Sequence, residues 1–214
     1  MIKLTKGIEP NILTLNKDAY KKALLDLIAA GEKVPDSVST KYNQDEIKDA
    51  LRGECFSKCM YCESKVEHIT DLHIEHIKPK AKHKFPELTF EYENLGLACP
   101  ICNRGKSDIY DDAIPFINPY LDEPEEHFYV YGAFVWAKPN NPRAKLTELK
   151  IDLNRPDLLE ARGERMKTIR GLINDYHSQP NPTLKAAIKK EILKEVEKDK
   201  IYSFCCKTLV NNTL

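Results

Sequence analysis

Apolar residues recur at near-helical spacing in two stretches close to the start of the chain. The first stretch predicts a helix over residues 18–30, which Gly31 would end. The second predicts a helix over residues 44–52, ending near Gly53. We therefore expect residues 1–54 to form an N-terminal helical segment that leads into the first of the chain's cysteine pairs.

The apolar pattern changes in residues 55–110, which hold most of the chain's cysteines and histidines. The apolar runs at residues 73–77 and 95–98 are too short to be helices, so they predict two strands with a loop between them. A helix is expected to begin near Cys99. This core, with helices before and after it, predicts an α+β fold.

Residues 111–214 begin with proline-punctuated loops and become helical towards the end. Alternating aromatic and aliphatic residues at 127–131 and 133–138 flank a glycine, which predicts a β-hairpin. From residue 157 to residue 206 the pattern predicts two helices, broken at 179–182 where two prolines fall close together. Their charged outer faces and aliphatic inner face are typical of a helical cap or a partner surface.

The composition is that of an ordinary soluble globular protein, with 42% hydrophobic and 31% charged residues. No run approaches the roughly 18 apolar residues that cross a bilayer, and the first residues lack the features of a secretory signal. We therefore expect a cytoplasmic protein with no membrane association.

The formal net charge is zero, from 33 basic and 33 acidic residues. A small protein that binds nucleic acid alone usually carries a basic excess, so any such contact must come from a local patch or from a partner subunit. A local basic run is present, although a solvated lysine-rich loop is the ordinary interpretation of such a run. Its members are Lys78, Lys80, Lys82, His83, Lys84, Arg104 and Lys106.

Four of the seven cysteines form two CxxC pairs, Cys59 with Cys62 and Cys99 with Cys102. A CxxC turn brings two thiolates within reach of one tetrahedral ion, and two such turns complete the four-thiolate shell typical of structural zinc. Buried free thiols are the alternative, and a thioredoxin-type redox pair is disfavoured because the βαβ context is missing. The other cysteines are expected to be small packing residues. These are Cys55, Cys205 and Cys206.

The sequence between and just beyond the cysteine pairs holds the residues of a candidate reaction site. They are Glu75, His76, Asn94, Asn103 and Lys106. Hydrolysis of a phosphodiester requires a base that activates water and a cation that neutralises the developing charge. The neutral imidazole of His76 can accept a proton at cellular pH. The Glu75 carboxylate and the Asn103 side-chain oxygen are hard ligands that suit Mg²⁺ or Mn²⁺.

Each of these residues also has an ordinary interpretation when taken singly. A lone histidine is usually a satisfied polar residue, and asparagine commonly occupies turns and helix caps. Adjacent residues of a strand point to opposite faces, so Glu75 and His76 can both serve only if the strand ends or twists there. Pro79 nearby is consistent with an end to the strand.

The succession CxxC, EHIxPK and ENLxxxCxxCNxxK closely resembles the HNH, or ββα-metal, nucleases, including the variant found in RNA-guided CRISPR nucleases. The resemblance implies a ββα-metal core in which His76 is the general base. It also implies that Glu75 and Asn103 hold a catalytic Mg²⁺ or Mn²⁺. Asn103 stands where the family often has histidine, as in the CRISPR branch, and Glu75 stands where Asp or His is more common.

The same resemblance implies supporting roles for three further residues. Asn94 would brace the loop between the two strands and orient His76. Lys106 would approach the scissile phosphate, and His73 is a candidate auxiliary metal ligand.

A narrower resemblance covers nearly the whole chain. The start MIKLTKG, the core just described and the later segments INPYLDEPEEHF and TELKIDLNRPDLLEARGERM look like the HNH component of the Septu anti-phage system and its retron-associated relatives. This resemblance implies a role in bacterial defence and a partner, an ABC-type ATPase of the PtuA kind. A partner that shares the engagement of the target would also account for the neutral charge. The expected substrate is nucleic acid, DNA rather than RNA.

Two alternatives remain open from the sequence. One is a non-catalytic four-cysteine zinc module that binds protein or nucleic acid, but such a module has no need of a histidine beside a carboxylate. The other is a stand-alone restriction or homing nuclease, which the neutral charge and the absence of an Arg-rich recognition helix disfavour.

Overall fold

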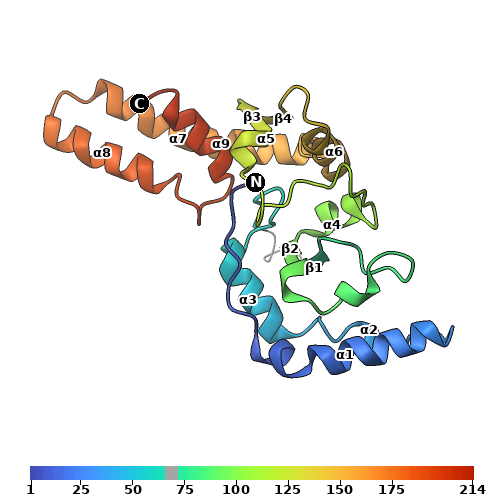
Figure 1. Cartoon of the computed structure of the whole chain (residues 1–214). Helices are drawn as coiled ribbons and strands as arrows, with labels where there is room; N and C mark the ends of the chain where they lie inside the picture. Colours follow the sequence, from blue (N-terminus) through green and yellow to red (C-terminus); the bar gives the residue numbers. More distant parts are fainter. Residues whose placement is uncertain (66–71) are drawn as a thin grey trace.

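Two short antiparallel sheets, β1 with β2 and β3 with β4, lie among helices in the computed structural model, which describes residues 1–65 and 72–214 (Figure 1). The α+β class predicted from the sequence is confirmed. The helices and strands are α1 (Asn11–Ala29), α2 (Asp36–Ser39), α3 (Asp45–Cys55), β1 (His73–His76), β2 (Leu95–Ala98), α4 (Pro100–Lys106), α5 (Pro124–His127), β3 (Phe128–Tyr131), β4 (Phe134–Ala137), α6 (Pro142–Ile151), α7 (Pro156–Ser178), α8 (Pro182–Lys194) and α9 (Ser203–Asn211). Two short 3₁₀ helices, Pro86–Leu88 and Tyr92–Asn94, precede β2.

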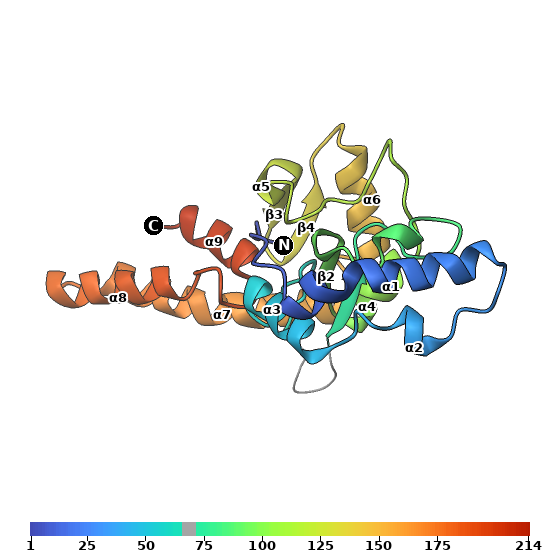
Figure 2. The same ribbon diagram turned by 60° about the horizontal axis from the view of Figure 1, so that its bottom comes forward.

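The ββα core of β1, β2 and α4 lies between helices from the two ends of the chain (Figures 1 and 2). α1 and α2 lie at one end of the molecule, and the paired helices α7 and α8 extend away at the other. The hairpin β3–β4 and helix α6 lie next to the core, where α6 packs on α4. The predicted arrangement, an HNH-type core flanked by N-terminal and C-terminal helices, is therefore present.

The first two predicted helices are found with different ends. α1 begins at Asn11 rather than at residue 18. Pro10 is its N-cap residue, and the Pro10 carbonyl accepts from the amides of Leu13 and Thr14. α3 continues past Gly53 and ends where Phe56 adopts a left-handed conformation with φ of 57°. The glycine that was expected to end the helix is thus accommodated inside it. The short helix α2 was not predicted.

The strands of the core are those that the apolar runs predicted. They pair in antiparallel fashion, from His73 opposite Ala98 to His76 opposite Leu95. Every residue of β2 is buried, so this strand runs through the interior of the core. Cys99 is the N-cap residue of α4, where a helix was expected to begin.

The hairpin β3–β4 also follows the prediction. It turns at Gly132, whose φ of 58° is a conformation that glycine adopts without strain. Helix α6 follows it and was not predicted, although its start carries the usual signals. Pro142 lies in its first turn, and the side chain of Asn141 accepts a hydrogen bond from a backbone amide there.

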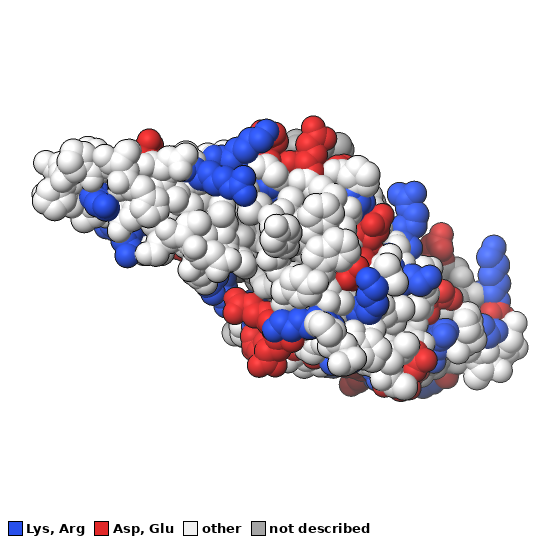
Figure 3. All heavy atoms as spheres, turned by 90° about the horizontal axis from the view of Figure 1, so that it is seen from above, with Lys and Arg blue, Asp and Glu red and all other residues white. Residues whose placement is uncertain are grey.

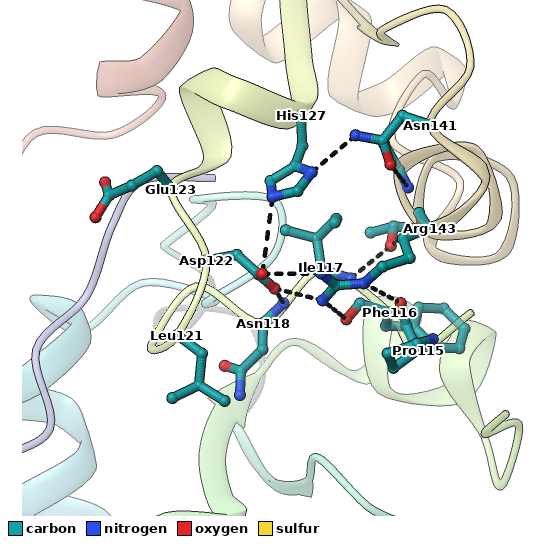
Figure 4. A network of polar contacts seen from close by, with 12 residues as sticks. Pro115, Phe116, Ile117, Asn118, Leu121, Asp122, Glu123, His127, Asn141 and Arg143 are labelled. Carbon is teal, nitrogen blue, oxygen red and sulfur yellow. Dashed lines mark hydrogen bonds and ion pairs between the residues drawn. The ribbon is translucent and has the colours of Figure 1, made fainter. Parts of the chain in front are cut away.

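An ion pair between Asp122 and Arg143 connects the loop before the hairpin to α6 (Figure 4). The guanidinium of Arg143 donates to both carboxylate oxygens of Asp122, at 2.6 and 3.0 Å, and to the carbonyl of Pro115 at 3.0 Å. His127 Nε2 lies 3.7 Å from the same carboxylate, and its Nδ1 accepts from Asn141 at 2.8 Å. Burial alone would raise the pKa of Asp122, but the hydrogen bonds from Arg143 more than offset it, and the pKa lies below its usual range.

The C-terminal region has α7, α8 and α9 where the sequence predicted two helices. The second predicted helix ends at Lys194, and α9 starts separately at Ser203. α9 is separate because Tyr202, its N-cap residue, adopts a left-handed conformation with φ of 54°. The start of α9 is then held by hydrogen bonds to a buried carboxylate. The buried carboxylate of Glu63 accepts from Ser203 Oγ at 3.0 Å and from the Phe204 amide at 3.3 Å, which ties α9 to the turn of the first cysteine pair.

Acidic and basic side chains are interspersed on the face shown in Figure 3. No continuous basic track crosses that face, in keeping with a net charge of zero. Within the two described ranges, the helices are all too short or too polar to cross a membrane.

Gly105→Ala should destabilise the fold because α4 and α6 meet at this residue. A Cβ at Gly105 would lie 2.3 Å from the carbonyl oxygen of Lys150, so the contact between the two helices would have to open. Overpacking of this kind costs about 1–3 kcal/mol. The midpoint of urea unfolding should therefore fall without a change in its slope.

Gly163→Ala is the matched control for this prediction. Nothing lies within 4 Å of a Cβ at Gly163, inside α7, so alanine should stabilise the helix by roughly 0.5–1 kcal/mol. Equal midpoints for the two variants would contradict the close approach of α4 and α6.

Candidate active site

Two turns bring the four cysteines of the CxxC pairs together beside the β1–β2 sheet. Their sulfur atoms all lie within 4.8 Å of one another, and all four residues are buried. The first turn is attached to β2 by a hydrogen bond of 2.8 Å from the amide of Met60 to the carbonyl of Leu97. Tetrahedral zinc with bonds of about 2.3 Å would place its sulfur ligands about 3.8 Å apart. The Cys62 and Cys99 sulfurs are 3.9 Å apart, so the cluster could hold a zinc ion, as predicted.

Arg155 supplies positive charge beside this cluster. Its Nη1 lies 3.8 Å from the Cys102 sulfur, and its side chain is buried. Burial alone would lower the pKa of Arg155, but the sulfurs of Cys102 and Cys62 raise it above its usual range. Contacts with the neighbouring thiols, Cys102 first, hold the pKa of Cys62 well below its usual range. The pKa of Cys99 is lowered too, whereas the pKa of Cys59 and that of Cys102 are raised well above their usual range, so the shifts divide the cluster between thiolate and thiol. All four residues would bind a metal ion as thiolates.

Glu75, His76 and Asn103 line one cavity of about 290 Å³ where β1 meets α4. Glu75 and His76 are neighbours in the chain, and both reach the cavity because β1 ends at His76. The structure thus gathers a carboxylate, an imidazole and an amide around one space. Other residues of the wall include Tyr42, Lys80, Ser107 and Asp108.

His76 is held as a neutral ring with one free nitrogen. Its Nε2 lies 3.0 Å from the backbone carbonyl of Thr89. A carbonyl can only accept a hydrogen bond, so Nε2 carries the proton and Nδ1 keeps a lone pair. The ring of Tyr42 packs against the imidazole at 4.5 Å and 89°. Burial lowers the pKa of His76 to about 3, so the ring is neutral at pH 7.

Glu75 and Lys106 form a buried ion pair. Lys106 Nζ lies 2.6 Å from Glu75 Oε1, although the approach lacks the geometry of a hydrogen bond. The same ammonium donates to the carbonyl of His76 at 2.8 Å. Burial raises the pKa of Glu75 to about 7, in spite of the opposing charge of Lys106. The family resemblance implied that Lys106 approaches the scissile phosphate. In the structure its side chain is 1% exposed, and its ammonium contacts Glu75 and the carbonyl of His76.

Asn103 lies between this cavity and His73. Its Nδ2 is 3.3 Å from His73 Nδ1. An amide nitrogen only donates, so this contact leaves Nδ1 of His73 unprotonated and directs the Asn103 oxygen elsewhere. Asn103 also lines the cavity that holds Glu75.

Asn94 spans the loop that follows β1. Its side-chain oxygen accepts from the amide of Lys78 at 2.8 Å, and its nitrogen donates to the carbonyls of Lys78 and Leu88 at 3.0 and 3.1 Å. The side chain therefore ties the end of β1 to the segment that presents the Thr89 carbonyl to His76. This is the geometry that the predicted bracing role requires.

The sequence analysis missed Tyr42 and Arg155. Tyr42 lies in the loop before α3 and reaches His76 only through the packing of the N-terminal helices on the core. Arg155 is 53 residues from Cys102 in the chain. Neither residue belongs to a local pattern, so no signal in the sequence could have identified it.

Residues 59–108 match the family model described as HNH endonuclease. These residues form an HNH endonuclease domain. The matched range contains both cysteine pairs and all the residues that line the site from β1 and α4. The resemblance to this family, expected from the motif, is confirmed.

Two proteins called Septu protein PtuB are similar to the chain beyond the HNH domain. One, from Bacillus thuringiensis, is 29% identical over 160 residues, which cover 74% of this chain and 57% of that protein. The other, from Bacillus mycoides strain KBAB4, is 25% identical over an alignment of 235 positions, gaps included, which spans 92% of this chain and 79% of that protein. The chain thus spans little more than half the length of the first relative. The expected resemblance to PtuB is confirmed.

His76 should stay neutral, with its proton on Nε2, over the whole range from about pH 8 to about pH 5. A free histidine takes up a proton near pH 6.5, whereas burial lowers the pKa of His76 to about 3. The contribution of His76 to stability is therefore present above about pH 6.5 and is lost as the pH falls towards 3, because the unfolded chain is protonated first. Long-range ¹H–¹⁵N spectra of the imidazole distinguish the two tautomers and the charged form. A protonation midpoint near pH 6.5 would contradict the burial of His76.

Proposed function

We propose that this chain is a metal-dependent HNH endonuclease that hydrolyses phosphodiester bonds of nucleic acid. The observation that carries the proposal is the cavity in which Glu75, His76 and Asn103 meet. These residues offer a carboxylate, a neutral imidazole with a free nitrogen and an amide oxygen, which are the groups that metal-assisted hydrolysis uses. The HNH endonuclease domain contains all of them.

His76 is the proposed general base, acting through Nδ1. The hydrogen bond from Nε2 to the Thr89 carbonyl fixes the ring and would stabilise the charged imidazolium that forms when Nδ1 takes a proton. A pKa of about 3 makes the ring a weak base in the free protein, and the negative charge of a bound phosphate would raise its proton affinity. Asn94 would orient the ring through the loop that carries Thr89.

Glu75 and Asn103 are the proposed ligands of the catalytic cation, Mg²⁺ or Mn²⁺. When bound, such a cation neutralises the charge that develops on the phosphate and the leaving oxygen. Both ligands offer the oxygen atoms that these ions prefer. Lys106 would favour the ionised form of Glu75 and hold the end of β1 through the His76 carbonyl. The resemblance also made His73 a candidate auxiliary ligand, but its Nδ1 accepts from Asn103, so it could bind the cation through Nδ1 only after this contact breaks.

The cysteine cluster is the proposed site of a structural zinc ion. All four ligands come from the protein, which is the mark of a structural rather than a catalytic zinc site. The catalytic cavity lies one residue further along the chain from Cys102, at Asn103. Zinc at the cluster would therefore position the catalytic residues without taking part in the reaction.

We further propose that the chain is the effector subunit of a bacterial anti-phage defence complex, with an ABC-type ATPase of the PtuA kind as its partner. The similarity to two proteins named Septu protein PtuB supports this assignment. The zero net charge also supports it, because a partner could share the binding of the target. DNA is the proposed substrate in preference to RNA, and a cytoplasmic location remains a prediction.

His76→Ala should abolish Mg²⁺- or Mn²⁺-dependent cleavage and leave the fold and the zinc content unchanged. Removal of a general base lowers the rate by about 10²–10⁴-fold. The assay follows plasmid DNA and RNA with each cation, with the chain alone and co-expressed with the ATPase. His177→Ala, an exposed histidine on α7 outside the HNH domain, is the matched control and should cleave as the wild type does.

Three outcomes of this assay would contradict the proposed nuclease or its proposed partner. Cleavage by His76→Ala at the wild-type rate would overturn the catalytic assignment. Absence of cleavage by the wild type under every condition would favour the non-catalytic zinc module. Cleavage by the chain alone, unchanged by the ATPase, would favour the stand-alone nuclease.

Cys102→Ser should yield a protein that is insoluble or lacks zinc. Loss of one thiolate opens the four-ligand shell and removes metal binding that small zinc domains need in order to fold. Metal content by inductively coupled plasma mass spectrometry and the unfolding midpoint give the two readouts. Cys206→Ala is the control, because it removes a buried thiol outside the cluster and should keep one equivalent of zinc. A stable Cys102→Ser protein with full zinc content would contradict a structural zinc site.

A further inference from the structure

The catalytic cavity has a neighbour on the other side of Asn103. This second cavity has a volume of about 320 Å³ and shares Tyr42, Ile74 and Asn103 with the first. The two cavities are therefore adjoining lobes of one cleft. The residues that belong only to the second lobe are Asn43, Lys48, Leu72 and His73.

The two lobes differ in charge. The catalytic lobe contains the carboxylates of Glu75 and Asp108. Among the described residues, no acidic side chain lines the second lobe. Lys48 forms no ion pair with residues 1–65 or 72–214, so its ammonium has no fixed counter-charge in that part of the protein. An unpaired ammonium in a hollow without carboxylates attracts an anion.

Hydrogen-bond donors accompany this charge. Because the Asn103 amide donates to Nδ1 of His73, the neutral His73 ring carries its proton on Nε2, where it can donate to a ligand. The side-chain amide of Asn43 is a further donor on the wall of the lobe. A positive charge with imidazole and amide donors is the kind of surface that contacts phosphate oxygens in protein–nucleic acid interfaces.

We propose that the second lobe binds the backbone phosphate next to the scissile phosphate of the nucleic-acid strand, with Lys48 as its main contact. This inference rests on the proposed function, since a strand that places one phosphate at His76 must continue across the cleft. Asn103, which lines both lobes, marks the boundary between the two phosphates. Lys48 lies on α3, which packs beside β2 and is outside the matched HNH domain, so it is a contribution of the N-terminal helices (Figure 1).

Lys48→Ala should weaken the binding of nucleic acid and reduce its salt dependence. The test uses full-length His76→Ala protein, which is expected to bind without cutting, and short fluorescein-labelled DNA and RNA, single-stranded and duplex. Loss of one phosphate contact lowers the slope of log K against log salt by about 0.9 for duplex DNA and about 0.7 for single strands. Lys48→Arg should keep the slope of the parent protein, since the positive charge is retained.

Lys33→Ala is the matched control, because Lys33 is an exposed lysine that lines neither lobe. It should leave the slope unchanged. Equal slopes for Lys48→Ala and Lys33→Ala would overturn the phosphate site, and the nuclease proposal would stand if the wild type cleaves. Failure of every variant to bind nucleic acid, together with failure of the wild type to cleave, would overturn both proposals.

Discussion

The cluster of four cysteines sets the geometry on which the rest of the molecule depends. It joins the turn after α3 to the start of α4 and so encloses the β1–β2 sheet between two fixed points. Asn103 follows Cys102 directly, so the position of the cluster decides where the Asn103 amide meets the strand that carries Glu75 and His76. Zinc binding contributes about 10–16 kcal/mol in small zinc peptides, whereas whole domains are stable by only about 5–15 kcal/mol. A metal ion at the cluster would therefore decide whether this part of the chain folds.

Two buried cations lie against the two anionic centres of the core. Arg155 contacts the cysteine sulfurs, and Lys106 contacts the carboxylate of Glu75. Each cation comes from a helix or loop beyond its anionic partner in the chain, so the charges pair only when the fold is complete. A buried cation also ties the C-terminal region to the turn of the first cysteine pair, because Lys58 donates to the carbonyls of Lys198 and Lys200 at 2.5 and 2.8 Å. The segment that leads into α9 is thus attached to the core, whereas α8 packs on α7.

Local patterns in the sequence predicted the centre of the molecule well. The strands of the core, the start of α4 and the cysteine cluster all depend on residues close together in the chain, such as the CxxC turns and the short apolar runs between them. The start of α1 at Asn11 was predicted wrongly, although Pro10, directly before it, belongs to the local sequence. The separate helix α9 was missed because it depends on the contact of Ser203 with Glu63, 140 residues away in the chain. The same distinction applies to the site. Glu75, His76 and Asn103 could be named from the motif, whereas Tyr42 and Arg155 reach the site through tertiary packing, which no local pattern records.

Burial of the Glu75 carboxylate is unfavourable for the stability of the fold, whereas a carboxylate at this position suits the proposed chemistry of the cavity. Glu75 is 2% exposed, and its Oε1 accepts no hydrogen bond from any residue within the described ranges, although Lys106 lies close to it. A buried carboxylate without full hydrogen bonding is costly, and replacement of a buried ion pair by apolar residues of similar volume often stabilises a protein. Packing alone therefore gives no reason for a carboxylate at this position. Glu75 also lines the cavity that it shares with His76 and Asn103, and its proposed role as a ligand of a hard cation gives a reason for a carboxylate there. The proposed chemistry of the cavity would therefore explain why a carboxylate paired with a buried ammonium, and not an apolar residue, lies at this position.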